Sequence, residues 1–148
     1  MEPEDDGYIG YMVSDVARLL RTVFDRRVRG NGLTRAQWLL LTRLHRRPGA
    51  SQTELAEMLE VDRASAGRMI DRLERKGWLE RRPDSGDRRI NRLHLTGEAR
   101  KVHAELWRIA QRTVDDALSG LSAGERAQYT VLTARVKSRL QDLAGSEA

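Results

Sequence analysis

The chain has 148 residues, 39% of them hydrophobic and 33% charged, with a formal net charge of +5 and no cysteine. This length predicts a single domain, residues 1–148, and the lack of cysteine excludes disulfides, thiolate zinc sites and thiol redox sensing. The positive charge favours an anionic partner, while three Trp, three Tyr and one Phe are too few for a stacking platform that binds single strands.

Two amphipathic helices are predicted before residue 50. Apolar residues recur at helical spacing from Ile9 to Phe24, and the glycines of "RGNG" close this segment. Thr34 is a good N-cap for a second helix, which carries Trp38 and ends before "RPGA".

The segment "SQTELAEMLEVDRASAGRMIDRLERKGWL" predicts two short helices joined by a tight turn. Ser51 caps the first helix, and Glu54 three residues later completes a capping box. "EVD" forms the turn, Asp62 caps a second helix that runs to about residue 76, and Gly77 supplies a left-handed stop. This is the spacing of a helix-turn-helix.

The second of these helices has two different faces. At about 100° per residue, an apolar stripe gathers Ala66, Met69, Ile70 and Leu73. The opposite face starts with small residues and continues with two long guanidinium groups, which suits a helix that enters a major groove; it consists of Ala64, Ser65, Arg68 and Arg72. An ordinary amphipathic surface helix is the alternative.

The stretch "RRPDSGDRRINRLHLT" (residues 81–96) predicts a β-hairpin with "WLERR" as its first strand and "INRLHL" as its second. "PDSG" has turn chemistry. Four arginines flank the turn, so the tip should repel itself unless an anionic group lies against it: Arg81, Arg82, Arg88 and Arg89. The alternative is a solvated hairpin whose charges prevent edge-to-edge pairing.

A hairpin directly after a helix-turn-helix is the layout of a winged helix, here residues 33–96, in which the hairpin is the wing. Its arginines would meet phosphates and a narrow minor groove.

Two more helices follow, one capped by Thr96 and one opened by a Ser122–Glu125 capping box. A winged-helix core needs neither these helices nor the first one. We therefore expect residues 8–30 and 97–145 to be dimerisation helices that pack against a second copy. The expected fold is mainly α with a small β-hairpin wing.

The motifs together resemble the MarR family of bacterial transcription regulators, and its SlyA-like members in particular. The resemblance spans residues 9–143, and its most specific pieces are "LTRAQW", "SQTELAEML", "MIDRLERKGWLERR" and the wing signature "DRR" running into "LHLT". It implies a homodimer that represses, or counteracts silencing, at a promoter carrying an inverted repeat of double-stranded DNA.

The resemblance also implies site residues. On the DNA side, Ser51 would lie near phosphates, and Asp87 and Arg89 would match the wing's Asp and minor-groove Arg. From the geometry of the hairpin tip we also expect Arg88 to point towards the DNA backbone. Ser65 and Arg68 would occupy recognition-helix positions, with Arg72 beside them as a phosphate contact. Ala64 joins the expected DNA-binding residues because it lies on the same face of the helix. Many family members release DNA when a phenolic or aromatic carboxylate binds, and the candidate ligand positions here are Arg18, Trp38 and Thr42. A core aromatic is the alternative interpretation of Trp38.

Other classes of protein fit the sequence less well. The three histidines show no metal-ligand spacing, and neither an HExxH motif nor a nucleophile elbow occurs. We therefore expect that the protein is not an enzyme and that it has neither a cofactor nor a metal site. His45 beside two arginines is interpreted as a charge cluster at a helix C-terminus. No apolar run reaches the roughly 18 residues of a membrane span and no leader is recognised, so we expect a cytoplasmic protein. A winged helix that binds RNA or docks on a protein is the remaining alternative.

Overall fold

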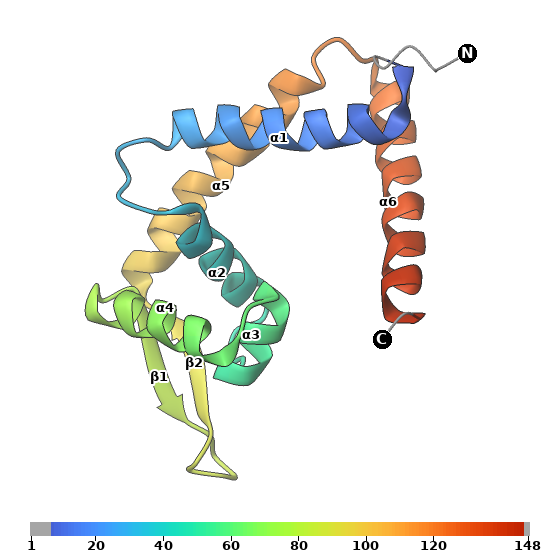
Figure 1. Cartoon of the computed structure of the whole chain (residues 1–148). Helices are drawn as coiled ribbons and strands as arrows, with labels where there is room; N and C mark the ends of the chain where they lie inside the picture. Colours follow the sequence, from blue (N-terminus) through green and yellow to red (C-terminus); the bar gives the residue numbers. More distant parts are fainter. Residues whose placement is uncertain (1–6, 147–148) are drawn as a thin grey trace. The chain divides into compact units, whose positions relative to one another are not determined.

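The computed structural model describes residues 7–146, so the ends of the predicted 1–148 domain lie outside the described part. This part contains six helices and a two-stranded antiparallel sheet (Figure 1). In chain order the elements are α1 (Ile9–Arg27), α2 (Arg35–Arg46), α3 (Gln52–Leu59), α4 (Arg63–Arg75), β1 (Leu79–Pro83), β2 (Asn91–Leu95), α5 (Gly97–Ala117) and α6 (Ala123–Ser146). The predicted mainly α fold with one hairpin is confirmed.

The hydrophobic core joins α2, α3, α4, the hairpin and the start of α5. The apolar stripe predicted for α4 is buried at Ala66, Ile70 and Leu73, while Met69 is only half-buried at its edge. The other large side chains of this core are Leu40, Leu41, Leu44, Leu55, Leu79, Leu93 and Leu95. Burial of these faces fixes which side of α4 remains exposed.

Side-chain caps set the starts of the helices. The predicted box at Ser51 is present, because Ser51 Oγ accepts from Glu54 N at 3.1 Å and Glu54 Oε2 accepts from Ser51 N at 2.8 Å. Thr34, expected only as an N-cap, forms a second such box with Gln37. Asp62 caps α4 by accepting from the backbone N–H of Ser65. Each cap satisfies N–H groups that a helix start leaves without a partner.

The turn between α3 and α4 depends on left-handed backbone. Glu60 is the C-cap of α3, with φ 55° and ψ 40°. Its backbone N–H donates to Glu57 O, and the next residue, Val61, donates to Ala56 O, both at 3.1 Å. These bonds reverse the chain tightly enough to bring α4 across α3.

Backbone hydrogen bonds between β2 and the segment before α3 anchor the hairpin to the helix-turn-helix. Its register runs from Leu79 opposite Leu95 to Pro83 opposite Asn91. On the outer side of β2, Gly49 N donates to Leu93 O and Leu93 N donates to Ala50 O, each at 2.9 Å. Figure 1 shows the hairpin extending away from α2, α3 and α4. The segment before α3 therefore holds the base of the wing.

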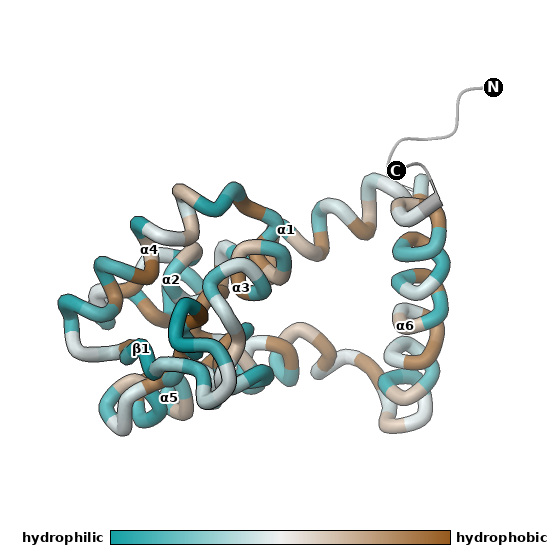
Figure 2. Tube along the Cα trace, turned by 90° about the horizontal axis from the view of Figure 1, so that it is seen from below, coloured by the Kyte–Doolittle hydropathy of each residue, from teal (hydrophilic) through white to brown (hydrophobic). Residues whose placement is uncertain are grey.

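The chain divides into two compact units, one ending at Ala110 and the other beginning at Gln111 within α5. In the second unit the Ser122–Glu125 capping box is formed as predicted. The predicted apolar face of α6 is between 42% and 60% exposed at each of its positions, which are Tyr129, Leu132, Val136, Leu140 and Leu143. Figure 2 shows hydrophobic residues recurring along this helix.

The first unit has a similar exposed face on α1. Its predicted apolar stripe is exposed at Ile9, Met12, Val13, Val16 and Leu19. None of the helices in residues 7–146 is long and apolar enough to span a bilayer.

Candidate nucleic-acid interface

The outer face of α4 presents the predicted recognition residues to solvent. Ala64, Arg68 and Arg72 are exposed, and Ser65 is partly exposed. Since Ala66, Ile70 and Leu73 point into the core, the helical period places these four side chains on the opposite side. The structure thus keeps them together on one accessible surface.

A chain of hydrogen bonds orders the start of this face. Arg68 Nη2 donates to Ser65 Oγ at 3.0 Å, and Ser65 Oγ donates to Asp62 Oδ2 at 2.6 Å. The side-chain and backbone hydrogen bonds from Ser65 hold the pKa of the Asp62 carboxyl below its ordinary value. Arg68 therefore starts from a defined pose over the first turn of α4.

The wing turn is built by two aspartates. Asp84 Oδ2 accepts from the backbone N–H groups of Gly86 and Asp87, each at 3.0 Å. Asp87 then accepts two hydrogen bonds from the Arg89 guanidinium, Nε to Oδ1 at 3.1 Å and Nη2 to Oδ2 at 3.2 Å. The Arg89 side chain is 91% exposed, and Arg88 beside it is also exposed. Asp87 thus orients a guanidinium that is otherwise surrounded by solvent.

The two arginines before the turn were expected to repel the other arginines of the hairpin tip, but both are paired with carboxylates of this chain. Arg81 turns back to α4, where Nη2 donates to Asp71 Oδ1 at 2.6 Å and Nη1 donates to Glu74 Oε1 at 2.8 Å. Arg82 is paired with Glu80 of its own strand. The carboxylates that neutralise Arg81 belong to this chain, so Arg81 serves the joint between wing and helix.

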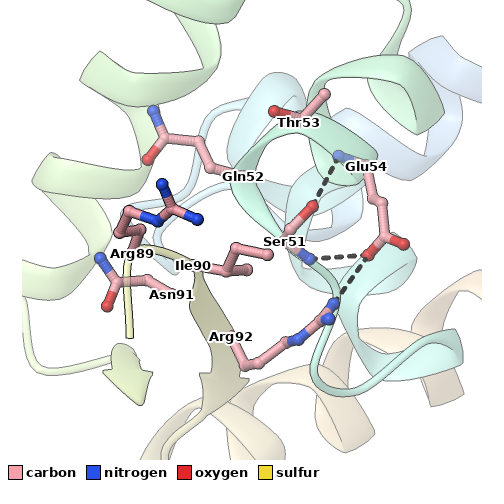
Figure 3. A pocket seen from close by; sticks show the side chains of 8 residues that line it. All are labelled: Ser51, Gln52, Thr53, Glu54, Arg89, Ile90, Asn91 and Arg92. Atoms are coloured by element: carbon pink, nitrogen blue, oxygen red, sulfur yellow. Dashed lines mark hydrogen bonds and ion pairs between the residues drawn. The ribbon is translucent and has the colours of Figure 1, made fainter. Parts of the chain in front are cut away.

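A polar hollow of about 390 Å³ lies between the N-terminus of α3 and the wing. Figure 3 shows Ser51 on one side of it and Arg89 on the other. Its other lining residues are Gln52, Thr53, Glu54, Ile90, Asn91 and Arg92. Two predicted DNA contacts from distant parts of the sequence thus share one depression, whose guanidinium, hydroxyl and amide groups suit phosphate oxygens.

The three candidate ligand positions are not gathered in one pocket. Trp38 lines a second hollow of about 270 Å³ together with Phe24, Val28, Leu33 and Leu106. Arg18 is not among the residues lining this hollow; it is exposed on α1 and its Nη2 lies 3.1 Å from Asp15 Oδ1. Thr42 Oγ1 is buried and has no hydrogen-bond partner within residues 7–146.

A buried histidine that was not predicted from the sequence lies beside this hollow. The His103 ring stacks on Trp38 at 5.2 Å and on His45 at 4.1 Å between ring centroids, so His45 belongs to a ring stack as well as to the charged end of α2. Burial, and then the neighbouring His45, lower the pKa of His103. The burial of His103 could have been predicted from helical spacing, because His103 comes four residues after Ala99 and three before Leu106, which are both buried on α5.

No metal centre accompanies these histidines. Within residues 7–146 there is no group of three or more His, Cys, Asp or Glu side chains that could hold a metal ion. The stacked rings of His45 and His103 form a contact between α2 and α5.

Comparison with known proteins identifies the architecture. The model of the MarR family matches residues 33–91, from the start of α2 to the beginning of β2. The chain is 34% identical over 126 residues to YybA, an HTH-type transcriptional regulator of Bacillus subtilis, and the match covers 85% of this chain and 84% of that protein. Among solved structures, MarR has a TM-score of 0.81 at 27% identity, with 99% of each chain covered. The transcriptional regulator SlyA has a TM-score of 0.76 at 31% identity, covering 90% of this chain and 94% of that one.

Proposed function

Because the chain belongs to the MarR family of DNA-binding transcription regulators, which are not enzymes, we propose that it represses transcription as a homodimer bound to an inverted-repeat promoter site. Counteracting another silencing protein at such a site is the same binding activity with the opposite outcome for the gene. The proposal treats residues 33–96 as the DNA-binding region and residues 8–30 and 97–145 as the dimerisation helices.

One observation carries this proposal: the exposed face of α4, the Ser51 end of α3 and the Arg89 side of the wing are all accessible in one unit of the chain. In this assignment Arg68 reads base edges, with Ala64 and Ser65 allowing close approach of the helix. Ser51, Arg72 and Arg88 contact phosphates. Arg89, oriented by Asp87, enters the minor groove.

The exposed apolar faces of α1 and α6 support the homodimer. Side chains such as Val16 and Leu140 are 44% and 60% exposed in the single chain, and faces of this kind usually mark a surface that another protein covers. A second copy of the same helices provides a matching apolar surface, and two-fold symmetry is the commonest arrangement for such an assembly. A two-fold dimer in turn requires a DNA site with inverted halves.

The hollow beside Trp38 supports control by a small aromatic ligand. It is lined by Trp38, Phe24 and Leu106 together with the charged residues Asp25, Arg29 and Arg35, which suits an aromatic ring with a carboxylate or phenol group. Arg18 and Thr42 would join this site only through rearrangement or through a second chain. Ligand binding here would release DNA by changing how α1, α2 and α5 pack.

Selection of duplexes from a random pool by the full-length protein tests the proposal. We expect the selection to recover an inverted repeat whose half-site centres lie about one helical turn apart. In a separate measurement, sedimentation of the protein should give a mass twice that of the chain. Recovery of sequences without two-fold symmetry, or stronger binding to structured RNA than to any duplex, would contradict it. Millimolar salicylate added to the complex then tests release, with benzyl alcohol as the uncharged aromatic control.

A further inference from the structure

The guanidinium of Arg92, the second residue of β2, contacts both sides of the hollow between the wing and α3. Arg92 Nε donates to Asp84 Oδ1 at 3.0 Å, while Arg92 Nη1 lies 3.4 Å from Glu54 Oε2 and 3.5 Å from Gly49 O. Figure 3 shows the side chain running from the strand towards Glu54, beside Ser51. The Arg92 side chain is only 34% exposed, and those of Asp84 and Glu54 are 24% and 33% exposed.

Each carboxylate that Arg92 contacts also organises one candidate DNA contact. Asp84 shapes the wing turn through the N–H groups of Gly86 and Asp87, and Asp87 orients Arg89. On the other side, Glu54 closes the capping box of Ser51. The guanidinium of Arg92 therefore bridges the two structures that present Arg89 and Ser51.

The electrostatics agree with this geometry. The hydrogen bond from Arg92 is the main reason that the pKa of the Asp84 carboxyl lies below its ordinary value. A charge-assisted bond between partly buried groups is stronger than one at the open surface. Arg82, which faces Arg92 across the hairpin, gives the contrast, because its side chain is 58% exposed and its ion pair is with Glu80 of the same strand.

We propose that Arg92 is a positioning residue, which locks the wing turn to the N-terminus of α3 so that Arg89 and Ser51 meet the same duplex. The inference rests on the proposed DNA-binding mode. In this assignment Arg92 acts through its contacts within the chain, because its Nε is directed to Asp84 and its Nη1 to Glu54 and Gly49.

The experiment compares Arg92→Met with Arg82→Met in the full-length protein. The two variants lose the same charge from opposite positions of one hairpin. The probe is the inverted-repeat duplex selected by the unaltered protein, measured by fluorescence anisotropy. We expect Arg92→Met to weaken binding about tenfold and Arg82→Met less than about threefold. Equal losses for the two variants would overturn the inference.

A double-mutant cycle separates positioning from direct contact. If Arg92 acts through the wing, Arg92→Met should cost less than about threefold in a chain that already carries Arg89→Ala. If Arg92 contacts phosphate itself, the two losses should multiply, and the positioning role would be rejected. Arg92→Lys keeps the charge but lacks the fork that reaches two carboxylates, so we expect it to resemble Arg92→Met.

Hydrogen exchange of the free protein provides a measurement that needs no DNA. In Arg92→Lys the amides of Gly86 and Asp87 should exchange about tenfold faster, while those of α4 stay unchanged. Unchanged exchange at the wing turn would overturn the inference even if the variant binds DNA weakly. Failure of the unaltered protein to select any inverted repeat would instead refute the proposed function, and the positioning role with it.

Discussion

Arg81 in β1 donates a 2.6 Å hydrogen bond to Asp71 in α4, so a wing strand and the candidate recognition helix share an ion pair beside the core. A second bond from Arg81 to Glu74 at 2.8 Å makes the contact two-pronged. The Arg81 side chain is 24% exposed, whereas Asp71 and Glu74 are 53% and 41% exposed, so solvent screens part of the attraction and the two-pronged geometry provides the rest of the restraint. The contacts of Arg81 with Asp71 and Glu74 thus restrain the angle between the wing and α4, in addition to the backbone that connects them.

This restraint predicts a loss of stability in Arg81→Met. We expect the free energy of unfolding to fall by about 1 kcal/mol, since both carboxylates lose a charged partner. Urea unfolding followed by circular dichroism measures it. Arg82→Met is the matched control and should change the stability by only a few tenths of a kcal/mol, roughly what an exposed pair contributes. Equal effects in the two variants would contradict the restraint.

The ion pair between Asp87 and Arg89 predicts that removing a negative charge from the wing weakens DNA binding, whereas net charge alone would predict tighter binding. Arg89→Ala should weaken binding of the selected duplex roughly tenfold to a hundredfold. Asp87→Ala should weaken it as well, although it makes the protein more positive, because Arg89 loses the partner that orients it. Anisotropy titrations at one salt concentration decide this. Tighter binding by Asp87→Ala would mean that the wing is only a diffuse positive surface.

The two arginines of α4 predict different kinds of loss. Arg68→Ala should cost roughly 1–3 kcal/mol on the selected duplex and reduce discrimination against altered half-sites. Arg72→Ala should weaken all duplexes alike and reduce the salt slope by about one. Titrations of matched and altered duplexes at several salt concentrations separate the two. An exchange of these behaviours would reverse the assigned roles.

Buried His103 predicts a dependence of stability on pH. Its pKa in the folded chain lies below the ordinary value of 6.5, because burial disfavours the charged ring. The unfolded chain therefore takes up this proton first, and stability that is complete above about pH 6.5 is lost as the pH falls towards the lower folded value. Thermal unfolding between pH 7.5 and 5.5 should show this loss, which His103→Phe should reduce. His94→Gln, a change in β2, should leave it in place.

The sequence predicted those parts of the fold that depend on neighbours along the chain. Ser51, Asp62 and Gly77 have local roles as caps and as a left-handed stop, and each was recognisable from residues within a turn or two of it. The buried face of α4 followed from periodicity in the same way. These features explain why helix ends and the hairpin were predicted closely.

The contacts that arrange the candidate site are different in kind. Arg92 meets Glu54 across 38 positions of sequence and Arg81 meets Asp71 across ten, and nothing in the local pattern distinguishes these arginines from Arg82 or Arg88. Whether Arg18, Trp38 and Thr42 share a pocket depends in the same way on how helices pack. Such pairings become visible only when the core has fixed the elements against one another.

Glu60 has a consequence for which sequences this fold can accept. Among the residues described, it is the only one other than glycine with a positive φ, and left-handed backbone is costly for most side chains and worst for branched ones. The position should therefore vary among Gly, Asn, Asp and unbranched polar residues, and exclude Val, Ile and Thr, whatever DNA the protein recognises. A constraint of this kind would appear as a narrow choice of residues in the α3–α4 turn even where the α4 surface beside it diversifies to read new sites.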